Sequence, residues 1–154
     1  MIRSLSKLFP GSLRLLINLW PPFLGAGIRV TRLDPTWKVM EVEMKLRRWN
    51  RNYVGTHYGG SLYSMTDPFF MLMLIENLGK DYIVWDKAAT VRFRKPGIGT
   101  VFSSFQLLDE QLDEIRHALK SEAKIERTFQ VEVKDETGAL VADVQKQIHI
   151  RRKG

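Results

Sequence analysis

The sequence predicts an α+β fold in which an antiparallel β-sheet wraps around one buried helix. Two observations lead to this prediction. Residues 69–75 are all apolar and follow a glycine pair, so the helix they form has no polar face and is expected to be covered on most sides. Five other segments alternate apolar and polar residues, which marks strands with one buried face. The 154 residues form one predicted domain, 1–154, with an N-terminal helical extension over 1–24.

The extension is predicted to contain a short amphipathic helix over residues 12–20. Apolar residues recur there at helical spacing, at Leu13, Leu16, Ile17 and Trp20. This helix either packs on the domain or makes peripheral contact with a membrane through residues 1–20. No apolar stretch reaches the ~18 residues needed to cross a bilayer. The paired prolines and glycines of WPPFLGAGIRV, residues 20–30, predict an irregular connector.

The strands are predicted from their period of two, over residues 40–46, 88–95, 101–107, 125–133 and 139–150. A second amphipathic helix is predicted over 110–121. Pro96-Gly97 is typical of the centre of a type II turn, and residues 135–138 of a hairpin turn. The simplest packing is a curved antiparallel sheet around a helix over 60–78, which is the hot-dog architecture. The hydrophobic pattern alone also allows a few other arrangements.

The composition limits the chemistry. The net charge is +7 and the pI is near 9.8, which favours nucleic acid, lipid headgroups or phosphorylated molecules as partners, unless the protein simply happens to be basic. The absence of cysteine excludes disulfides, thiol nucleophiles and thiolate zinc sites, and fits the cytoplasm as the expected compartment. The three histidines have no regular spacing, so no metal site is predicted. No nucleic-acid module is recognisable, so nucleic acid is not an expected partner.

The stretch NYVGTHYGGSLYSMTD carries the candidate chemistry. Gly59 and Gly60 begin a predicted helix, whose free N–H groups stabilise an oxygen that develops negative charge. The pair can equally serve a tight turn. Asp67 follows about two helical turns later and is either a base or nucleophile in a cleft, or a cap with Pro68 at the first position of a restarted helix. The residue pattern leaves both interpretations open.

This stretch, from Asn52 to Asp67, resembles the active-site segment of hot-dog acyl-CoA thioesterases of the phenylacetate-pathway type. Those enzymes read N-x-x-G-T-x-H-G-G, with an Asp seven residues after the second Gly. Residues 20–30 and 86–100 are more similar still to the DUF4442 thioesterase-like branch of the hot-dog superfamily. The resemblance covers roughly residues 20–150.

By this resemblance, Asn52 lines the site, the N–H of Gly59 polarises the thioester carbonyl, and Asp67 activates water or attacks the acyl carbon. It implies an acyl-CoA or acyl-carrier thioester hydrolase that needs no cofactor, with coenzyme A thioester as substrate. The site of such enzymes forms between two subunits, so a homodimer or homotetramer is implied. The alternative is a protein that binds acyl thioesters without hydrolysing them.

The sequence departs from the family pattern at three positions. Tyr58, a candidate site residue, occupies the motif histidine position. His57 lies one place earlier and is either a base or a structural or solvated loop residue. Val84 stands where those enzymes carry a serine ahead of the Asp that corresponds to Asp86, and Pro68 follows the candidate carboxylate. Tyr58 and Val84 favour the binding protein over the hydrolase.

Three cations are candidate contacts for the phosphates of coenzyme A. Arg92, Arg94 and Lys95 lie on one strand and its following turn. Arginine binds phosphate in a bidentate manner, which suits this role. The other interpretation is an ordinary solvated strand face.

Overall fold

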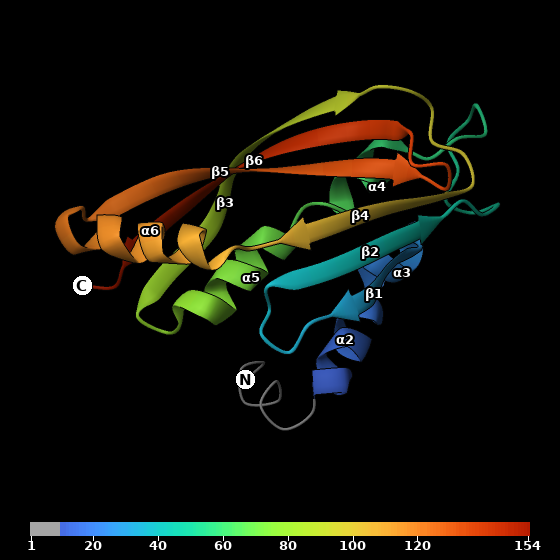
Figure 1. Cartoon of the computed structure of the whole chain (residues 1–154). Helices are drawn as coiled ribbons and strands as arrows, with labels where there is room; N and C mark the ends of the chain where they lie inside the picture. The colour runs from blue at the N-terminus through green and yellow to red at the C-terminus, as the bar shows by residue number, and fades with distance from the viewer. Residues whose placement is uncertain (1–9) are drawn as a thin grey trace.

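A computed structural model describes residues 10–154. Its six strands form one antiparallel sheet in the order β1-β2-β4-β5-β6-β3 (Figure 1). The strands are β1 (Ile28–Leu33), β2 (Val39–Lys45), β3 (Tyr82–Phe93), β4 (Thr100–Gln106), β5 (Lys124–Asp135) and β6 (Leu140–Arg152). The helices are α2 (Pro10–Asn18), α3 (Pro21–Ala26), α4 (Gly59–Ser64), α5 (Phe69–Leu78) and α6 (Asp109–Ser121). The sheet curves around α5, so the predicted hot-dog fold is confirmed.

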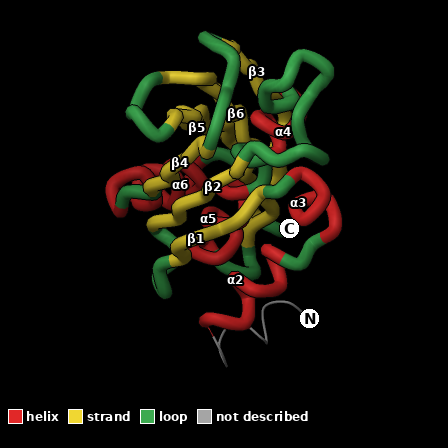
Figure 2. Tube along the Cα trace, turned by 90° about the vertical axis from the view of Figure 1, so that its right-hand side faces the viewer, coloured by secondary structure: helices red, strands yellow, loops and turns green. Residues whose placement is uncertain are grey.

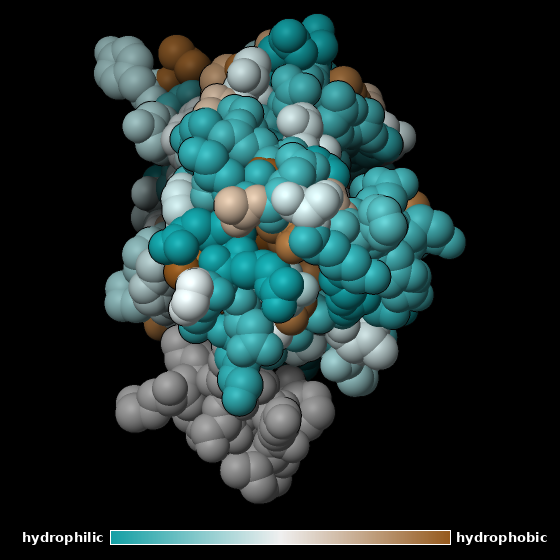
Figure 3. Space-filling model, turned by 90° about the vertical axis from the view of Figure 1, so that its left-hand side faces the viewer, coloured by the Kyte–Doolittle hydropathy of each residue, from teal (hydrophilic) through white to brown (hydrophobic). Residues whose placement is uncertain are grey.

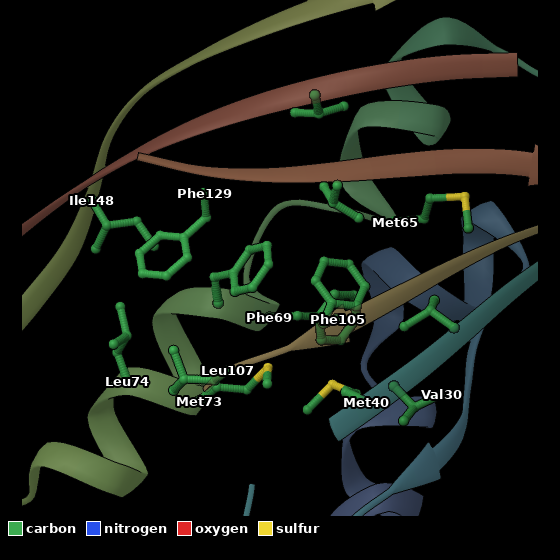
Figure 4. Packing of buried hydrophobic residues seen from close by; sticks show 14 of the residues in the cluster. Val30, Met40, Met65, Phe69, Met73, Leu74, Phe105, Leu107, Phe129 and Ile148 are labelled. Carbon is green, nitrogen blue, oxygen red and sulfur yellow. The ribbon is translucent and has the colours of Figure 1, made fainter. Parts of the chain in front are cut away.

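The core lies between α5 and the concave face of the sheet (Figure 4). The rings of Phe69 and Phe105 have centroids 5.0 Å apart, and those of Phe70 and Phe129 are stacked at 4.8 Å. All four rings are buried, and burial of one such side chain stabilises the fold by about 1.5–3 kcal/mol. These contacts fix α5, and therefore the segment immediately before it.

The predicted single helix over 60–78 is interrupted. Helix α4 ends at Ser64, and α5 begins only at Phe69. Pro68 has no N–H for a helical hydrogen bond and its ring crowds the preceding turn, so a continuous helix cannot pass through it. The interruption turns the chain at residues 65–68, where Asp67 lies.

The predicted irregular connector over residues 20–30 is wrong. The segment forms α3 and the start of β1. Pro21 and Pro22 occupy the first turn of α3, where the backbone N–H groups would be unpaired in any case. Gly27 ends the helix with a φ of +76°, and a Cβ there would lie 2.7 Å from Nδ2 of Asn50. The prolines and Gly27, which would break the interior of a helix, therefore mark the start and the end of α3.

The predicted type II turn at Pro96-Gly97 is also wrong. Strand β3 pairs with β6, whereas β4 pairs with β2 and β5, so residues 94–99 cross between strands that are not neighbours. The positive φ that a type II turn needs at its third residue is absent from Gly97 and occurs at Gly99, with a φ of +73°. Gly97 instead permits a close approach, because a Cβ there would lie 3.2 Å from both His57 and Val141.

The two edges of the sheet differ. At β1, the side-chain amide of Asn18 accepts a hydrogen bond from the Val30 N–H at 2.7 Å and donates one to the Val30 carbonyl at 3.1 Å. Helices α2 and α3 lie beside this edge (Figure 2). At the other edge, β3 pairs with β6 alone, and no further strand of residues 10–154 pairs with it.

Strand β3 contains a bulge at Lys87. Asp86 lies opposite Ile148 and Ala89 opposite Lys146, so one extra residue stands between two inward-facing positions. Beyond the bulge, Ala89 and Phe93 face the helix side of the sheet, yet both are exposed. The inner face is therefore uncovered along this part of β3.

The predicted extension over 1–24 is described only in part. Residues 1–9 lie outside the described residues, and the predicted helix over 12–20 corresponds to α2, which starts and ends earlier. Leu13 and Phe23 are buried, so α2 and α3 pack on the domain. Within the described part of the chain, none of the helices has the length and apolarity needed to cross a membrane.

Candidate functional site

Asp67 lies in the turn between α4 and α5. Its side chain makes no capping hydrogen bond to α5, whose N-cap position is Pro68. One carboxylate oxygen, Oδ1, lies 2.6 Å from Nζ of Lys146 and accepts a 2.6 Å hydrogen bond from the Tyr63 hydroxyl. Within the described residues Oδ2 has no hydrogen-bond partner, and 43% of the side-chain surface is exposed. Asp67 therefore keeps one oxygen free for solvent or substrate.

Lys146 is the buried centre of this cluster. Its side chain is completely buried in the middle of β6, where Nζ also lies 3.1 Å from Oδ1 of Asp86 and 3.2 Å from the Tyr63 hydroxyl. Burial alone would lower the pKa of Lys146, but the hydrogen bond to Asp67 and the charge of Asp86 outweigh it and raise the pKa. The ammonium is therefore charged at neutral pH, and it holds Asp67 beside the sheet.

Asp86 and Tyr63 complete the cluster. Asp86 forms an ion pair with Lys146 without a well-directed hydrogen bond, and burial raises the pKa of Asp86 against the attraction of that ammonium. Burial, together with the hydrogen bond to Asp67, raises the pKa of the Tyr63 phenol, so it remains a neutral donor. Tyr63 can reach Asp67 because it lies at the end of α4, four residues before Asp67 in the turn that follows.

The glycine pair lies at the start of α4. The first two N–H groups of this helix, at Gly59 and Gly60, have no hydrogen-bond acceptor within residues 10–154. A Cβ on Gly59 would lie 3.1 Å from the Phe93 ring, and one on Gly60 would lie 2.4 Å from the ring of Tyr58. The two aromatic rings therefore flank free backbone donors, which is the arrangement an oxyanion site requires.

Asn52 and His57 organise the preceding loop. Asn52 accepts hydrogen bonds from the N–H groups of Val54 and Thr56, and its amide donates to the Thr56 hydroxyl and the His57 carbonyl. His57 is buried, and its Nε2 donates to the Gly99 carbonyl at 3.0 Å. Burial lowers the pKa of His57, so the ring is neutral at neutral pH. Both side chains are thus engaged with backbone rather than with Asp67.

Tyr58 and Asn52 line a hollow that does not include Asp67. They line a surface cavity of about 340 Å³ together with Trp49, Ser61 and the end of α3. Tyr58 is 61% exposed there. Asp67 does not contribute to this lining. The structure therefore divides the sequence-predicted site residues between this hollow, the start of α4 and the Lys146 cluster.

The predicted phosphate contacts are paired with carboxylates. Nε of Arg94 lies 2.5 Å from Oδ2 of Asp143, and Nη1 of Arg92 lies 3.8 Å from Oδ1 of the same residue. Lys95 forms an ion pair with Asp135. The hydrogen bond from Lys95 lowers the pKa of Asp135, with help from Thr137. A phosphate would have to compete with these carboxylates, least strongly at Arg92.

The carboxylate and the free N–H groups lie at different heights along β3. Asp67 contacts Lys146, which is opposite Ala89, whereas Gly59 lies against the ring of Phe93. Four residues of strand separate these positions, about 13 Å. Within one copy of the chain, the parts of β3 that lie nearest to Asp67 and to Gly59 are therefore well separated along the open edge.

Lys146 and Tyr63 were not predicted as site residues. Asp86 was named only as the counterpart of an aspartate in the similar thioesterases. A signal for Lys146 was present, because it falls in the inward-facing alternation of residues 140–150. A lysine in a buried row needs anionic partners, which marks it for attention. No group of three or more histidine, aspartate and glutamate residues in the described chain is arranged to hold a metal ion.

The sequence matches the family described as "Domain of unknown function (DUF4442)" over residues 12–150, which is most of the chain. The chain belongs to the DUF4442 family. No curated protein matches the sequence of this chain. The DUF4442 assignment agrees with the resemblance seen in the segments around residues 20–30 and 86–100.

Solved structures support the fold of this DUF4442 protein. PA5026 from Pseudomonas aeruginosa, described as a probable thioesterase, is similar with a TM-score of 0.80 at 23% identity, over 94% of this chain and 97% of that one. Thioesterase HI1161 from Haemophilus influenzae has a TM-score of 0.65 at 12% identity, over 89% and 87%. PaaI from the phenylacetic acid degradation operon of E. coli has a TM-score of 0.62 at 18% identity, over 91% and 89%. At these identities the likeness establishes the hot-dog fold.

Proposed function

We propose that this DUF4442 protein hydrolyses acyl thioesters, with Asp67 as the base that activates water. The observation that carries the proposal is the state of the Asp67 carboxylate. Oδ1 is held by Lys146 and Tyr63 while Oδ2 has no partner among residues 10–154, so the carboxyl group is oriented and accessible. The thioesterase descriptions of PA5026 and HI1161 agree with this chemistry.

The reaction follows from these groups. Oδ2 of Asp67 takes a proton from water while the oxygen attacks the thioester carbonyl carbon. The carbonyl oxygen becomes negative and is stabilised by the free N–H groups at Gly59 and Gly60. The C–S bond then breaks, and the thiol leaves with the proton that Asp67 held. The products are a carboxylic acid and a free thiol, with no cofactor consumed.

We infer that this site forms between two copies of the chain. Strand β3 offers an unpaired edge, and its exposed inner positions run from Ala89 to Phe93. Pairing two such edges in antiparallel fashion places the Phe93 end of one strand beside the Asp86 end of the other. The N–H groups of Gly59 in one subunit then approach Asp67 of the second. A homodimer, or a tetramer built from it, is the proposed assembly.

Substitution of the carboxylate tests the reaction. With a panel of acyl-CoA and acyl-carrier thioesters, release of free thiol by Asp67→Asn should fall by about 10² or more. Asp113→Asn, at an exposed position on α6, is the matched control and should keep full activity. Circular dichroism confirms that each variant is folded. Equal turnover by Asp67→Asn and the control would exclude Asp67 as the base.

Two substitutions at Gly59 distinguish the role of its backbone N–H from the effect of adding a side chain beside Phe93. Gly59→Pro removes the N–H at the first helical position, where proline is tolerated, and Gly59→Ala keeps it while adding a similar Cβ. The proline variant should lose about 10²–10³ in kcat relative to the alanine variant. Similar kcat values for the two variants would contradict an oxyanion role for this N–H.

Mixing tests the shared site. Asp67→Asn and Gly59→Pro are each expected to be inactive, but unfolded and refolded together they form mixed dimers with one intact site. Statistical mixing should restore about a quarter of the wild-type activity. Recovery of none, with dimers present by sedimentation, would place both groups in one subunit and contradict the proposal.

A second candidate function is binding of acyl thioesters without turnover. The departures from the thioesterase pattern at Tyr58 and Val84 favour it, and Oδ1 of Asp67 is already engaged by Lys146. Calorimetry would then show tight acyl-CoA binding while the wild-type protein releases no thiol. The same thiol assay therefore decides between the two functions.

A further inference from the structure

Positive charge is concentrated in two segments of the chain. Residues 1–33 and 44–66 contain nine of the 24 Lys and Arg residues and none of the 17 Asp and Glu residues. The remainder of the chain has 15 cations against 17 carboxylates, so the entire net charge of +7 arises in these two segments. Such segregation creates a local field that attracts anionic partners.

The same segments carry most of the exposed apolar surface. Nine of the 14 large hydrophobic residues that are exposed in the described chain lie in them. Five are on α2, α3 and the residues between them, with exposures of 47–58%: Leu15, Leu16, Leu19, Trp20 and Leu24. Four more belong to the loop before α4: Trp49, Tyr53, Val54 and Tyr58. By contrast, the face at the α6 end is mostly hydrophilic (Figure 3).

The two segments are joined in space. The amide of Asn50, in the loop, donates to the Ala26 carbonyl at the end of α3 and to the Lys45 carbonyl at the end of β2. Figure 2 shows α2, α3 and the loops on the side of the molecule that faces the viewer. We call the exposed residues of α2, α3 and the loop over 46–58 the basic apolar surface. The buried side chains of Leu13 and Phe23 hold its helices firmly on the domain.

The cations of this surface are available to a partner. Arg14, Arg47, Arg48 and Arg51 are exposed, and none of them forms an ion pair with a carboxylate of residues 10–154. Arg47 lies over the Trp49 ring at 5.2 Å, a contact that leaves its charge uncompensated. Arg92, Arg94 and Lys95, in contrast, are all paired with carboxylates.

We propose that the basic apolar surface binds the headgroup region of an anionic membrane. Short helices that expose Leu and Trp beside Arg are typical of segments that lie in the plane of a bilayer interface. Trp and Tyr are favoured at that depth because their rings combine apolar and polar character. A second copy of the chain is a poor occupant, since two carboxylate-free surfaces of the same charge repel each other. The proposal does not depend on hydrolysis at Asp67.

Vesicle co-sedimentation of the full chain tests this. The protein should bind vesicles of equal parts phosphatidylglycerol and phosphatidylcholine, bind pure phosphatidylcholine weakly, and be released by added salt. The double variant Arg47→Glu, Arg48→Glu should reduce binding by about thirtyfold or more. Arg151→Glu, Arg152→Glu makes the same change in net charge at the far end of the chain and should bind nearly as well as wild type.

A second pair of variants tests the apolar part. Leu24→Ser should weaken vesicle binding severalfold, whereas Leu108→Ser, at a position of similar exposure near α6, should not. Failure of the wild type to bind anionic vesicles at low salt would overturn the proposal. So would equal losses in the two arginine double variants, which would indicate net charge alone. Sedimentation showing that Leu24→Ser dissociates a dimer, or binding to polyglutamate but not to vesicles, would assign the surface to a protein partner and also overturn it.

Discussion

The two edges of the sheet are treated in opposite ways. At β1 the side chain of Asn18 occupies the hydrogen-bonding groups of Val30, and α2 and α3 lie alongside. At β3 none of the described strands of residues 10–154 lies beyond the edge, and inner-face residues such as Phe93 are exposed. A bare edge invites another strand, and a covered edge prevents it. The difference agrees with the proposed assembly through β3, which would leave the β1 side available for other contacts.

Replacing Lys146, near the open β3 edge, should produce the largest loss in the free energy of unfolding. Lys146→Met leaves the carboxylates of Asp67 and Asp86 without their cation, and breaking a buried ion pair from one side costs about 3–5 kcal/mol. Urea denaturation at pH 7 measures the loss. The loss should shrink in acid, because burial raises the pKa of Asp86, and a protonated Asp86 no longer needs the ammonium. In the wild type, a raised pKa means that the Lys146 contribution persists through neutral pH and is lost only as the pH rises above 10.5 and through the folded value.

Two controls define that result. Lys87→Met removes a half-exposed ion pair with Glu126 on the same sheet and should cost less than about 1 kcal/mol. Adding Asp67→Asn and Asp86→Asn to Lys146→Met should recover much of the stability, because no buried charge then lacks a partner. Wild-type stability of Lys146→Met alone would show that water solvates the two carboxylates.

The closed edge should respond to Asn18. Asn18→Ala leaves the N–H and carbonyl of Val30 without partners and should cost about 1–3 kcal/mol in the free energy of unfolding. Asn18→Asp retains the acceptor for the N–H but not the donor, so its loss should be intermediate. Urea denaturation of the three proteins gives the order. A neutral effect of Asn18→Ala would mean that Leu13 and the Arg14 hydrogen bond to Thr31 hold α2 by themselves.

The smallest expected effect concerns His57, which links the loop before α4 to the segment that leaves β3. Its lowered pKa means that the unfolded chain binds a proton more readily, so stability is complete above pH 6.5 and falls as the pH drops below it. The loss is limited to about 1.4 kcal/mol for each pH unit. His57→Gln should flatten this part of the stability profile, whereas His117→Gln, at an exposed position on α6, should leave it unchanged. Identical profiles for wild type and His57→Gln would show that His57 does not control it.

The hydrophobic pattern predicted the sheet and the buried helix because both depend on local periodicity. The failures involve proline and glycine, whose effect depends on position. Pro21 and Pro22 start a helix, Pro68 separates two helices, and Gly97 serves a close approach rather than a turn. Periodicity could not distinguish these cases, because the neighbours that decide them are distant in the sequence.

The candidate site was predicted in part. Asp67 and the glycine pair could be found because their residue types and spacing are local and match a known motif. Lys146 could not be joined to Asp67 from the sequence, because 79 residues separate them and only the packing of the α4–α5 turn against β6 brings them together. The sequence also could not show which cations lack a carboxylate partner. Arg94 and Lys95 are paired and the arginines around Trp49 are not, and this difference arises only in the folded chain.

The bulge at Lys87 lets β3 hold one residue more than the segment of β6 that pairs with it. Because side chains alternate, one residue more or fewer exchanges every inward and outward position on one side of the change. Lys87 is the exception: deleting it would place Asp86 and Ala89 two residues apart, where regular alternation still points both toward the helices, and would remove only the local bend and added twist of the bulge. A deletion between Ala89 and Phe93, in contrast, is expected to turn Phe93 away from the helices and so to alter the half of the strand that is proposed to meet a second subunit.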